Sequence, residues 1–223
     1  MLISTLRISL ATQQAVSNYK NRLTKPSDHG FGRSRGGLST KTHALVDGAG
    51  LPIVVSLTPG QAGDNPMALP LLDAIRVPRK RGRPRTRPDE LRADKAYSSR
   101  QVREFCRAHH IKVTIPEPVD RIRNRKRQGS RGGRPPAFDK ESYKGRNVVE
   151  RRFCDFKQWR GLATRYDKYA IIFRAGILLA SMVAWLKKII RHALTHITII
   201  TTPLQNTRSE HMTAVRSRPG SGS

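Results

Sequence analysis

Residues 143–159 carry a charged side and an apolar side at helical spacing, and this pattern constrains the fold more than any other. On an α-helix, four polar residues project from one side within about a sixth of the circumference: Tyr143, Arg146, Glu150 and Lys157. Four apolar residues fall on the opposite side: Val148, Val149, Phe156 and Trp159. A helix with such an apolar side packs on a core. The segment therefore predicts a docked helix that exposes one carboxylate among two cations and a phenol.

The other patterns predict an α/β domain in which helices lie on a mixed sheet. Two β-rich runs flank the turn sequence Asp47-Gly48-Ala49-Gly50 and predict a hairpin of residues 42–46 and 53–57. Short apolar runs predict further strands at residues 2–10, 91–94 and 111–115. Periodic segments predict helices at residues 11–23, 64–75, 98–108 and 173–188, with Ser98 as the cap of the third. Loops are expected at residues 30–37, 76–88 and 116–136.

A large excess of basic residues predicts a polyanionic partner. The 223 residues include 43 Lys and Arg against 16 Asp and Glu, which gives a net charge of +27. Such a charge strengthens binding to nucleic acid because each neutralised phosphate releases counterions. Charge alone also fits a ribosome-like or RNA-binding protein. Two basic runs, residues 79–87 and 121–134, are expected to supply sequence-independent affinity for DNA.

Each basic run contains candidate DNA contacts. In the first, Arg81-Gly82-Arg83-Pro84 resembles the core of a hook that lies in the minor groove. A generic phosphate-binding loop that uses Arg81 and Arg83 is the alternative. In the second run, Arg123, Arg125 and Lys126 are expected to contact DNA.

Cysteine usage and hydropathy indicate a protein of the reducing cytoplasm. Cys106 and Cys154 lack CxxC spacing, so the sequence supports neither a disulfide scaffold nor a zinc site, and both are expected to pack internally. The longest apolar run has 12 residues, 175–186, which is too short to cross a bilayer and predicts a buried core helix. No export signal is expected. Trp159 and Trp185 are expected in the core.

Two carboxylates stand out in this basic chain. Asp94 closes a predicted strand, at the edge where α/β sheets place ligands, and Glu150 lies on the charged side of the helix described above. Two such carboxylates can hold Mg²⁺, and a pair of these ions supports phosphodiester displacement. The alternative is structural: Glu150 forms an i,i+4 ion pair with Arg146, and Asp94 caps the following helix.

The spacing Tyr143-x2-Arg146-x3-Glu150-x6-Lys157 resembles the signature of the DDE transposases of bacterial insertion sequences, in the group named for those four residue types. Four further segments are similar to this family: residues 93–97, which resemble the strand of its second aspartate, residues 32–41, residues 57–64 and residues 163–168. The resemblance covers residues 28–188.

The resemblance implies an RNase H-like fold whose first strand is missing or incomplete here. Asp94 would be the second catalytic aspartate and Glu150 the catalytic glutamate, both ligands of Mg²⁺ or Mn²⁺. Tyr143, Arg146 and Lys157 would contact DNA around the reacting phosphate. The implied chemistry is metal-dependent hydrolysis at the element ends, followed by attack of the freed 3′-hydroxyl on target DNA.

The resemblance also implies partners and an organisation of the chain. The partners would be double-stranded DNA of the element ends and the target, further copies of the chain in a homo-oligomer on DNA, and a polypeptide from an upstream reading frame. No membrane is involved, and the protein would be cytoplasmic and associated with the nucleoid. The catalytic domain would cover residues 29–188, between a poorly defined segment of residues 1–28 and a tail of residues 189–223, expected to be partly disordered.

The sequence departs from the family pattern at the first catalytic aspartate. No Asp or Glu precedes Asp28, and Ile3-Ser4-Thr5 stands where a strand with Asp-Ser-Thr is expected. Asp28 and Asp47 are poor substitutes, because each lies in a predicted loop or turn. The chain is then either the downstream part of an enzyme encoded in two frames or a truncated copy. Both predict DNA binding without cleavage, and the alternative function is a non-catalytic remnant or a regulator of an intact transposase.

Overall fold

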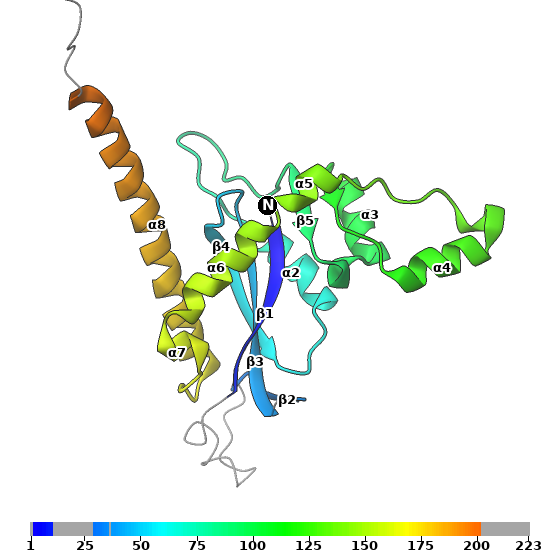
Figure 1. Ribbon diagram of the computed structural model, residues 1–223, viewed down its shortest axis with the longest axis horizontal. Coiled ribbons are helices and arrows are strands. Elements are labelled where there is room, and N and C mark those ends of the chain that lie inside the picture. The colour runs from blue at the N-terminus through cyan, green and yellow to red at the C-terminus, as the bar shows by residue number, and fades with distance from the viewer. Residues whose placement is uncertain (1, 11–28, 36, 202–223) are drawn as a thin grey trace, which may run out of the picture. The chain divides into compact units, whose positions relative to one another are not determined.

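The computed structural model describes residues 2–10, 29–35 and 37–201 (Figure 1). The chain divides into two compact units, residues 1–185 and residues 186–223. The helix predicted at residues 11–23, Asp28 and the last part of the predicted tail, residues 202–223, lie outside the described residues.

A mixed sheet forms the centre of the first unit (Figure 1). Its strands are β1 (Leu2–Leu10), β2 (Gly32–Ser34), β3 (Gly37–Val46), β4 (Pro52–Pro59), β5 (Glu90–Ala93) and β6 (Lys112–Thr114). Across the sheet the order is β4-β3-β1-β5-β6, and β2 also pairs with β3. Strand β3 runs antiparallel to its neighbours, whereas β1, β5 and β6 are parallel.

The first strand is present, which corrects the expectation that it is missing or incomplete. Strand β1 has nine residues and pairs with both β3 and β5, so it lies in the interior of the sheet. The predicted hairpin is also confirmed as β3 and β4. Its turn is fixed by Asp47, whose Oδ1 accepts the backbone N–H groups of Ala49 at 2.9 Å and of Leu51 at 2.8 Å. Asp47 is thus committed to the turn, as an Asp-Gly sequence predicts.

The helices are α2 (Ala68–Asp73), α3 (Arg100–Ala108), α4 (Val119–Arg127), α5 (Lys140–Lys144), α6 (Asn147–Lys157), α7 (Arg160–Ala163) and α8 (Ala170–Thr201). Among the residues that the structure describes, three 3₁₀ turns accompany them: η2 (Asn65–Met67), η3 (Lys95–Tyr97) and η4 (Gly129–Gly132).

Several predicted boundaries are wrong in detail. Residues 116–136 contain α4, and residues 30–37 contain β2. The helix predicted at residues 64–75 begins as η2, because Pro66 favours a tight first turn. The cap of α3 is Ser99 rather than Ser98, since the Ser99 hydroxyl accepts the N–H of Val102.

Two apolar cores lie on opposite faces of the sheet. One joins Leu45 of β3 and Leu91 of β5 to helices α2 and α3. The other joins Ala44 of β3 to Val149 and Phe153 of α6 and to α8. Strand residues therefore alternate between the two cores, as the pleat requires.

The predicted signature helix is divided into α5 and α6. At Gly145 and Arg146 the backbone stays right-handed but bonds three residues back, with Arg146 N–H donating to Tyr143 O at 2.9 Å. Val149 and Phe156 are buried as predicted, but Trp159 is 46% exposed and Cys154 is exposed, which corrects both expectations. Cys154 lies on the solvent side of α6, between the buried Phe153 and Phe156 in sequence, and Trp159 lies beyond Lys157, where α6 ends.

Helix α8 is longer than predicted and only one side of it is buried. Phe173, Ile177 and Ala180 pack into the second core, whereas Leu179 and Met182 are exposed. Within the described residues, Ala170–Leu194 is the one stretch long and apolar enough to cross a membrane by length and composition. Core helices of soluble proteins pass the same test, so it places nothing in a membrane.

A buried arginine links distant parts of the fold. The guanidinium of Arg165 is fully buried and donates to His29 O at 2.7 Å, to Thr40 Oγ1 at 2.5 Å, and to two carbonyls of its own loop. It also lies over the ring of Phe31, 3.8 Å from the centroid. The segment 163–168 therefore has a structural role in joining α7 to β3.

Candidate active site

The site is built on alternate residues of β5. Leu91 and Ala93 face the first core, so the residues before, between and after them face α5 and α6. These are Glu90, Arg92 and Asp94, and they are called the β5 row below. Asp94 directly follows the strand, and its Oδ1 accepts the N–H of Lys95 at 2.8 Å. The predicted capping contact is therefore present, and Asp94 is still 43% exposed.

The guanidinium of Arg146 lies between two carboxylates. Its Nη2 is 2.5 Å from Glu150 Oε1, and its Nη1 is 3.8 Å from Asp94 Oδ1. The sequence placed Asp94 and Glu150 in separate elements, and the fold brings both to one cation. The predicted i,i+4 ion pair is thus real, but it is also part of a three-group cluster in which negative charge gathers around a single guanidinium.

Tyr143 completes this cluster. Its ring lies 5.4 Å from the Arg146 guanidinium carbon, in a cation–π contact. Burial raises the pKa of the Tyr143 phenol; nearby Arg146 lowers it, while the carboxylates of Asp94 and Glu150 raise it further. The phenol therefore stays protonated at neutral pH and can donate a hydrogen bond to an anion.

Polar contacts hold α5 against the β5 row. Glu90 Oε1 accepts the hydroxyls of Ser142 at 2.5 Å and Thr114 at 2.7 Å, and Glu90 Oε2 accepts Arg92 Nη2 at 2.7 Å. Burial raises the pKa of Glu90, but these hydrogen bonds outweigh it and lower the pKa to about 2. Gly145 lies close to Arg92, since a Cβ there would be 2.7 Å from Arg92 Nη1. The joint between α5 and α6 is therefore fixed to β5.

The remaining predicted contacts lie apart from this cluster. Lys157 is exposed at the end of α6, two turns from Glu150 and therefore about 10 Å further along the helix. Arg81 and Arg83 are exposed on the loop between α2 and β5, where the chain turns at Gly82 with φ of 84°. That turn fits a phosphate-binding loop better than the extended path of a minor-groove hook.

The second basic run lies on α4. Arg123 and Lys126 are exposed, but Arg125 is half-buried against Glu117, with Arg125 Nη1 2.5 Å from Glu117 Oε2. Arg125 is thus already paired in this structure. Sequence reasoning missed Glu117 as its partner, because the contact depends on how α4 folds back on the preceding loop.

The pairing of β1 places position 4 beside Asp94. Ile3 pairs with Ala93, and Asp94 follows Ala93, so Ser4 is the next residue in this register. Ser4 also pairs with Ala44, which packs in the α6 core. Among the described residues no group of three or more His, Cys, Asp or Glu side chains is arranged to hold a metal ion. The carboxylates available at this point are therefore Asp94 and Glu150.

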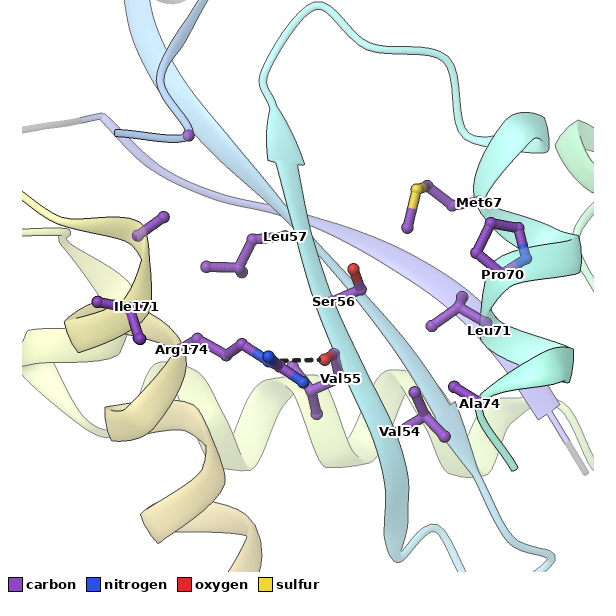
Figure 2. A pocket seen from close by; sticks show the side chains of 12 residues that line it. Val54, Val55, Ser56, Leu57, Met67, Pro70, Leu71, Ala74, Ile171 and Arg174 are labelled. Carbon is purple, nitrogen blue, oxygen red and sulfur yellow. Dashed lines mark hydrogen bonds between the residues drawn. The ribbon is translucent and has the colours of Figure 1, made fainter. Parts of the chain in front are cut away.

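A hollow beside β4 lacks the carboxylates that a metal site needs. Figure 2 shows this edge strand between α2 and α8, where Arg174 Nε donates to Val55 O at 3.2 Å. The hollow has a volume of about 330 Å³, and its lining contains one charged residue, Arg174, and no carboxylate. It is therefore not a candidate for metal-dependent chemistry.

The protein is therefore an α/β domain with a candidate site for phosphodiester chemistry. The site consists of two carboxylates and an arginine that meet at the end of an inner strand. The model of the transposase DDE domain matches residues 13–186. The chain therefore belongs to the family of DDE transposases, whose function is DNA transposition. The match begins after β1.

Two curated relatives agree with this assignment. The chain is 31% identical over 150 residues to a putative transposase for insertion sequence element IS6501 of Brucella ovis, an alignment that covers 67% of this chain and all of the relative. It is 32% identical over 148 residues to a putative transposase for insertion sequence element IS402 of Burkholderia cepacia, with 66% of this chain and 63% of the relative covered. No solved structure matches the chain significantly.

Proposed function

We propose that this chain is the catalytic-domain part of an insertion-sequence transposase with an RNase H-like fold, and that Asp94 and Glu150 are two of its catalytic carboxylates. The observation that carries the proposal is the placement of both carboxylates around Arg146 at the end of an inner strand. The strand order β4-β3-β1-β5-β6, with only β3 antiparallel, supports the fold. The contact between Arg146 and Asp94 joins segments that are 52 residues apart in the sequence.

The donor set suits a hard divalent cation. Mg²⁺ binds through one or two carboxylates and completes its shell with water and phosphate oxygens, and Mn²⁺ accepts the same ligands. Asp94 and Glu150 would hold the ion, and both are partly exposed, which leaves room for those ligands. When bound, the ion supplies activation of the attacking oxygen and stabilisation of the leaving oxygen.

The other residues of the cluster bind and orient the DNA strand. The guanidinium of Arg146, which lies between Asp94 and Glu150, would pair with a phosphate oxygen. The protonated phenol of Tyr143 donates a further hydrogen bond to the same phosphate. Lys157, about 10 Å away, contacts a neighbouring phosphate of the strand. These groups hold the backbone while water or a 3′-hydroxyl attacks.

The basic surfaces supply affinity for the rest of the DNA. Arg81 and Arg83 on their loop and Arg123 and Lys126 on α4 are exposed cations, so they contact phosphates of double-stranded DNA at the element ends and the target. Arg125 joins them only if it leaves Glu117. Binding should weaken steeply as salt rises from about 50 to 200 mM. A flat response to salt would count against this role.

Activity depends on a third carboxylate that β1 does not supply. Ser4 stands at the position beside Asp94, so we propose that the chain alone binds DNA without cleaving it. A nicking assay with a supercoiled plasmid that carries element ends, in Mg²⁺ and in Mn²⁺, tests this. A metal-dependent nick that the Glu150→Gln variant lacks would show that the chain is a complete enzyme.

The alternative is a non-catalytic DNA-binding remnant that regulates an intact transposase, favoured by the same missing carboxylate. In that role the chain assembles on DNA with further copies or with a polypeptide from an upstream frame, in the cytoplasm at the nucleoid. Co-purification of two differently tagged copies on DNA, with Glu150→Gln unaffected, would support it.

A further inference from the structure

Two hollows adjoin each other beside the start of β5. The first has a volume of about 820 Å³ and the second about 450 Å³. They share three lining residues, Arg85, Pro88 and Asp89, and the two adjoining hollows are together called the depression. The first hollow also includes Glu90 and Arg92 of the β5 row, and it therefore begins two residues from Asp94.

The first hollow has apolar walls and an aromatic ring. Its walls include Pro52, Ile53 and Val77, and Trp185 stands at its margin. The indole Nε1 of Trp185 donates to Pro52 O at 2.9 Å, which fixes the ring while 39% of the residue stays exposed. Trp185 is thus not a core residue, contrary to expectation. A fixed, exposed indole beside apolar walls is a stacking surface for a planar ring.

The charges of the first hollow cancel. It contains three arginines and three carboxylates. The carboxylates are engaged: Asp47 by the backbone of its turn, Asp89 by Arg85 at 2.5 Å, and Glu90 by Arg92 at 2.7 Å. An anion would gain little electrostatic stabilisation in this hollow, because its charges are balanced and its carboxylates are engaged. A neutral aromatic ring can enter without disturbing these pairs.

The second hollow has the opposite character. Its lining includes Arg79, Arg83 and Arg87 together with His109 and His110, and a single carboxylate, Asp89, which is paired with Arg85. This excess of positive charge suits phosphate groups. A nucleotide joins a neutral planar base to a charged phosphate. The base matches the first hollow, with its indole and apolar walls, and the phosphate matches the adjoining basic hollow.

We propose that this depression binds unpaired nucleotides of the DNA strand next to the reacting phosphate, with one base against Trp185 and the adjoining phosphates at Arg79 and Arg83. A base inside a duplex is stacked and paired, so only an unpaired nucleotide can enter. The proposal rests on the proposed function, since it requires that the chain binds DNA. It adds a preference for unpaired nucleotides that duplex binding alone does not explain.

Two single-tryptophan variants of the full chain test the proposal. Trp159→Phe leaves Trp185 as the one tryptophan, and Trp185→Phe leaves Trp159, which is exposed on the segment between α6 and α7 and serves as the matched control. Each is titrated with a blunt duplex and with the same duplex extended by five unpaired thymidines. The fluorescence of the remaining tryptophan shows whether a base contacts its ring, and the anisotropy of labelled DNA measures binding.

The expected result is strong quenching of Trp185 by the extended DNA, weak quenching by the blunt duplex, and little change of Trp159 with either. Trp185→Leu should weaken binding of the extended DNA roughly 5- to 100-fold and leave blunt-duplex binding within about twofold. Equal effects on both DNAs would overturn the proposal and leave the proposed function intact. Failure to bind either DNA would instead overturn the proposed function. Circular dichroism checks that each variant is folded.

Discussion

The hydroxyl of Ser142 lies 2.5 Å from Glu90 Oε1, across 52 residues of sequence. This contact joins α5 to β5, and the same strand presents Asp94 two pleats further on. The position of Tyr143 and Arg146 relative to Asp94 is therefore set by a polar contact outside the catalytic cluster. Glu90 is in this sense a positioning residue.

Replacement of Glu90 should loosen α5. Glu90→Gln removes the charge that Arg92 and Lys112 face, and we expect a loss of about 1–3 kcal/mol in the free energy of unfolding. Amide hydrogen exchange in residues 140–150 should accelerate. Urea denaturation measures the stability. Glu104→Gln, which breaks an exposed pair with Arg100, is the control and should cost only about 0.3–0.5 kcal/mol.

A carboxylate at position 4 should create a metal site. Ser4→Asp adds it in register with Asp94, at the position that pairs with Ala44, so Mn²⁺ should bind roughly tenfold more tightly or better. Ile3→Asp is the matched control, because Ile3 pairs with Leu45 of the opposite core. Calorimetric titration with Mn²⁺ distinguishes them. Equal affinity of the two variants would contradict the register argument.

Arg146 should compete with cations for the two carboxylates. Arg146→Gln removes the guanidinium from between Asp94 and Glu150, so Mn²⁺ affinity should rise roughly threefold to tenfold while DNA affinity falls by a similar factor. Arg151→Gln changes an exposed residue of the same helix and serves as control. Each variant removes one positive charge. An equal loss of DNA affinity in both would therefore show that Arg146 contributes only its net charge and makes no specific contact with a phosphate.

The sequence singled out Asp94 and Glu150 but not the contacts that place them. These two residues stand out because carboxylates are rare in the chain and their setting resembles a known signature, and their catalytic role stays a prediction. Glu90 and Ser142 were missed, since neither has a local pattern and their contact depends on the packing of α5. Strand alternation could have found Glu90, which shares the face of Asp94. Trp185 was misjudged because an aromatic residue at helical spacing usually belongs to a core, whereas here it lies where the buried side of α8 ends.

Stability should depend on pH through His43. Its ring is fully buried, with Nε2 2.7 Å from Thr58 Oγ1, and burial lowers its pKa from 6.5 to about 4, aided by Lys41 and opposed by Asp64. The unfolded chain therefore binds the proton first. About 3 kcal/mol of stability, present above pH 6.5, should be lost as the pH falls toward 4. Thermal unfolding at a series of pH values measures this, and His43→Gln should remove it while the exposed control His110→Asn should not.

Arg165 should be intolerant of replacement. Arg165→Met removes the hydrogen bonds that the buried guanidinium donates to Thr40 Oγ1 and to the carbonyls of His29 and Lys168, so we expect a loss of about 2–4 kcal/mol in the free energy of unfolding. Arg160→Met, at an exposed position, should cost less than about 0.5 kcal/mol. Similar losses for both would show that the buried contacts contribute little.

The alternation of β5 has a consequence for how this chain can change. Because Glu90, Arg92 and Asp94 share one face and Leu91 and Ala93 the other, an insertion or deletion of one residue within the strand would exchange the two sets. The core would then receive charges, and the face toward α5 and α6 would receive leucine. Single substitutions along β5 preserve this alternation, whereas the insertion or deletion of one codon would exchange its two faces and disrupt the site.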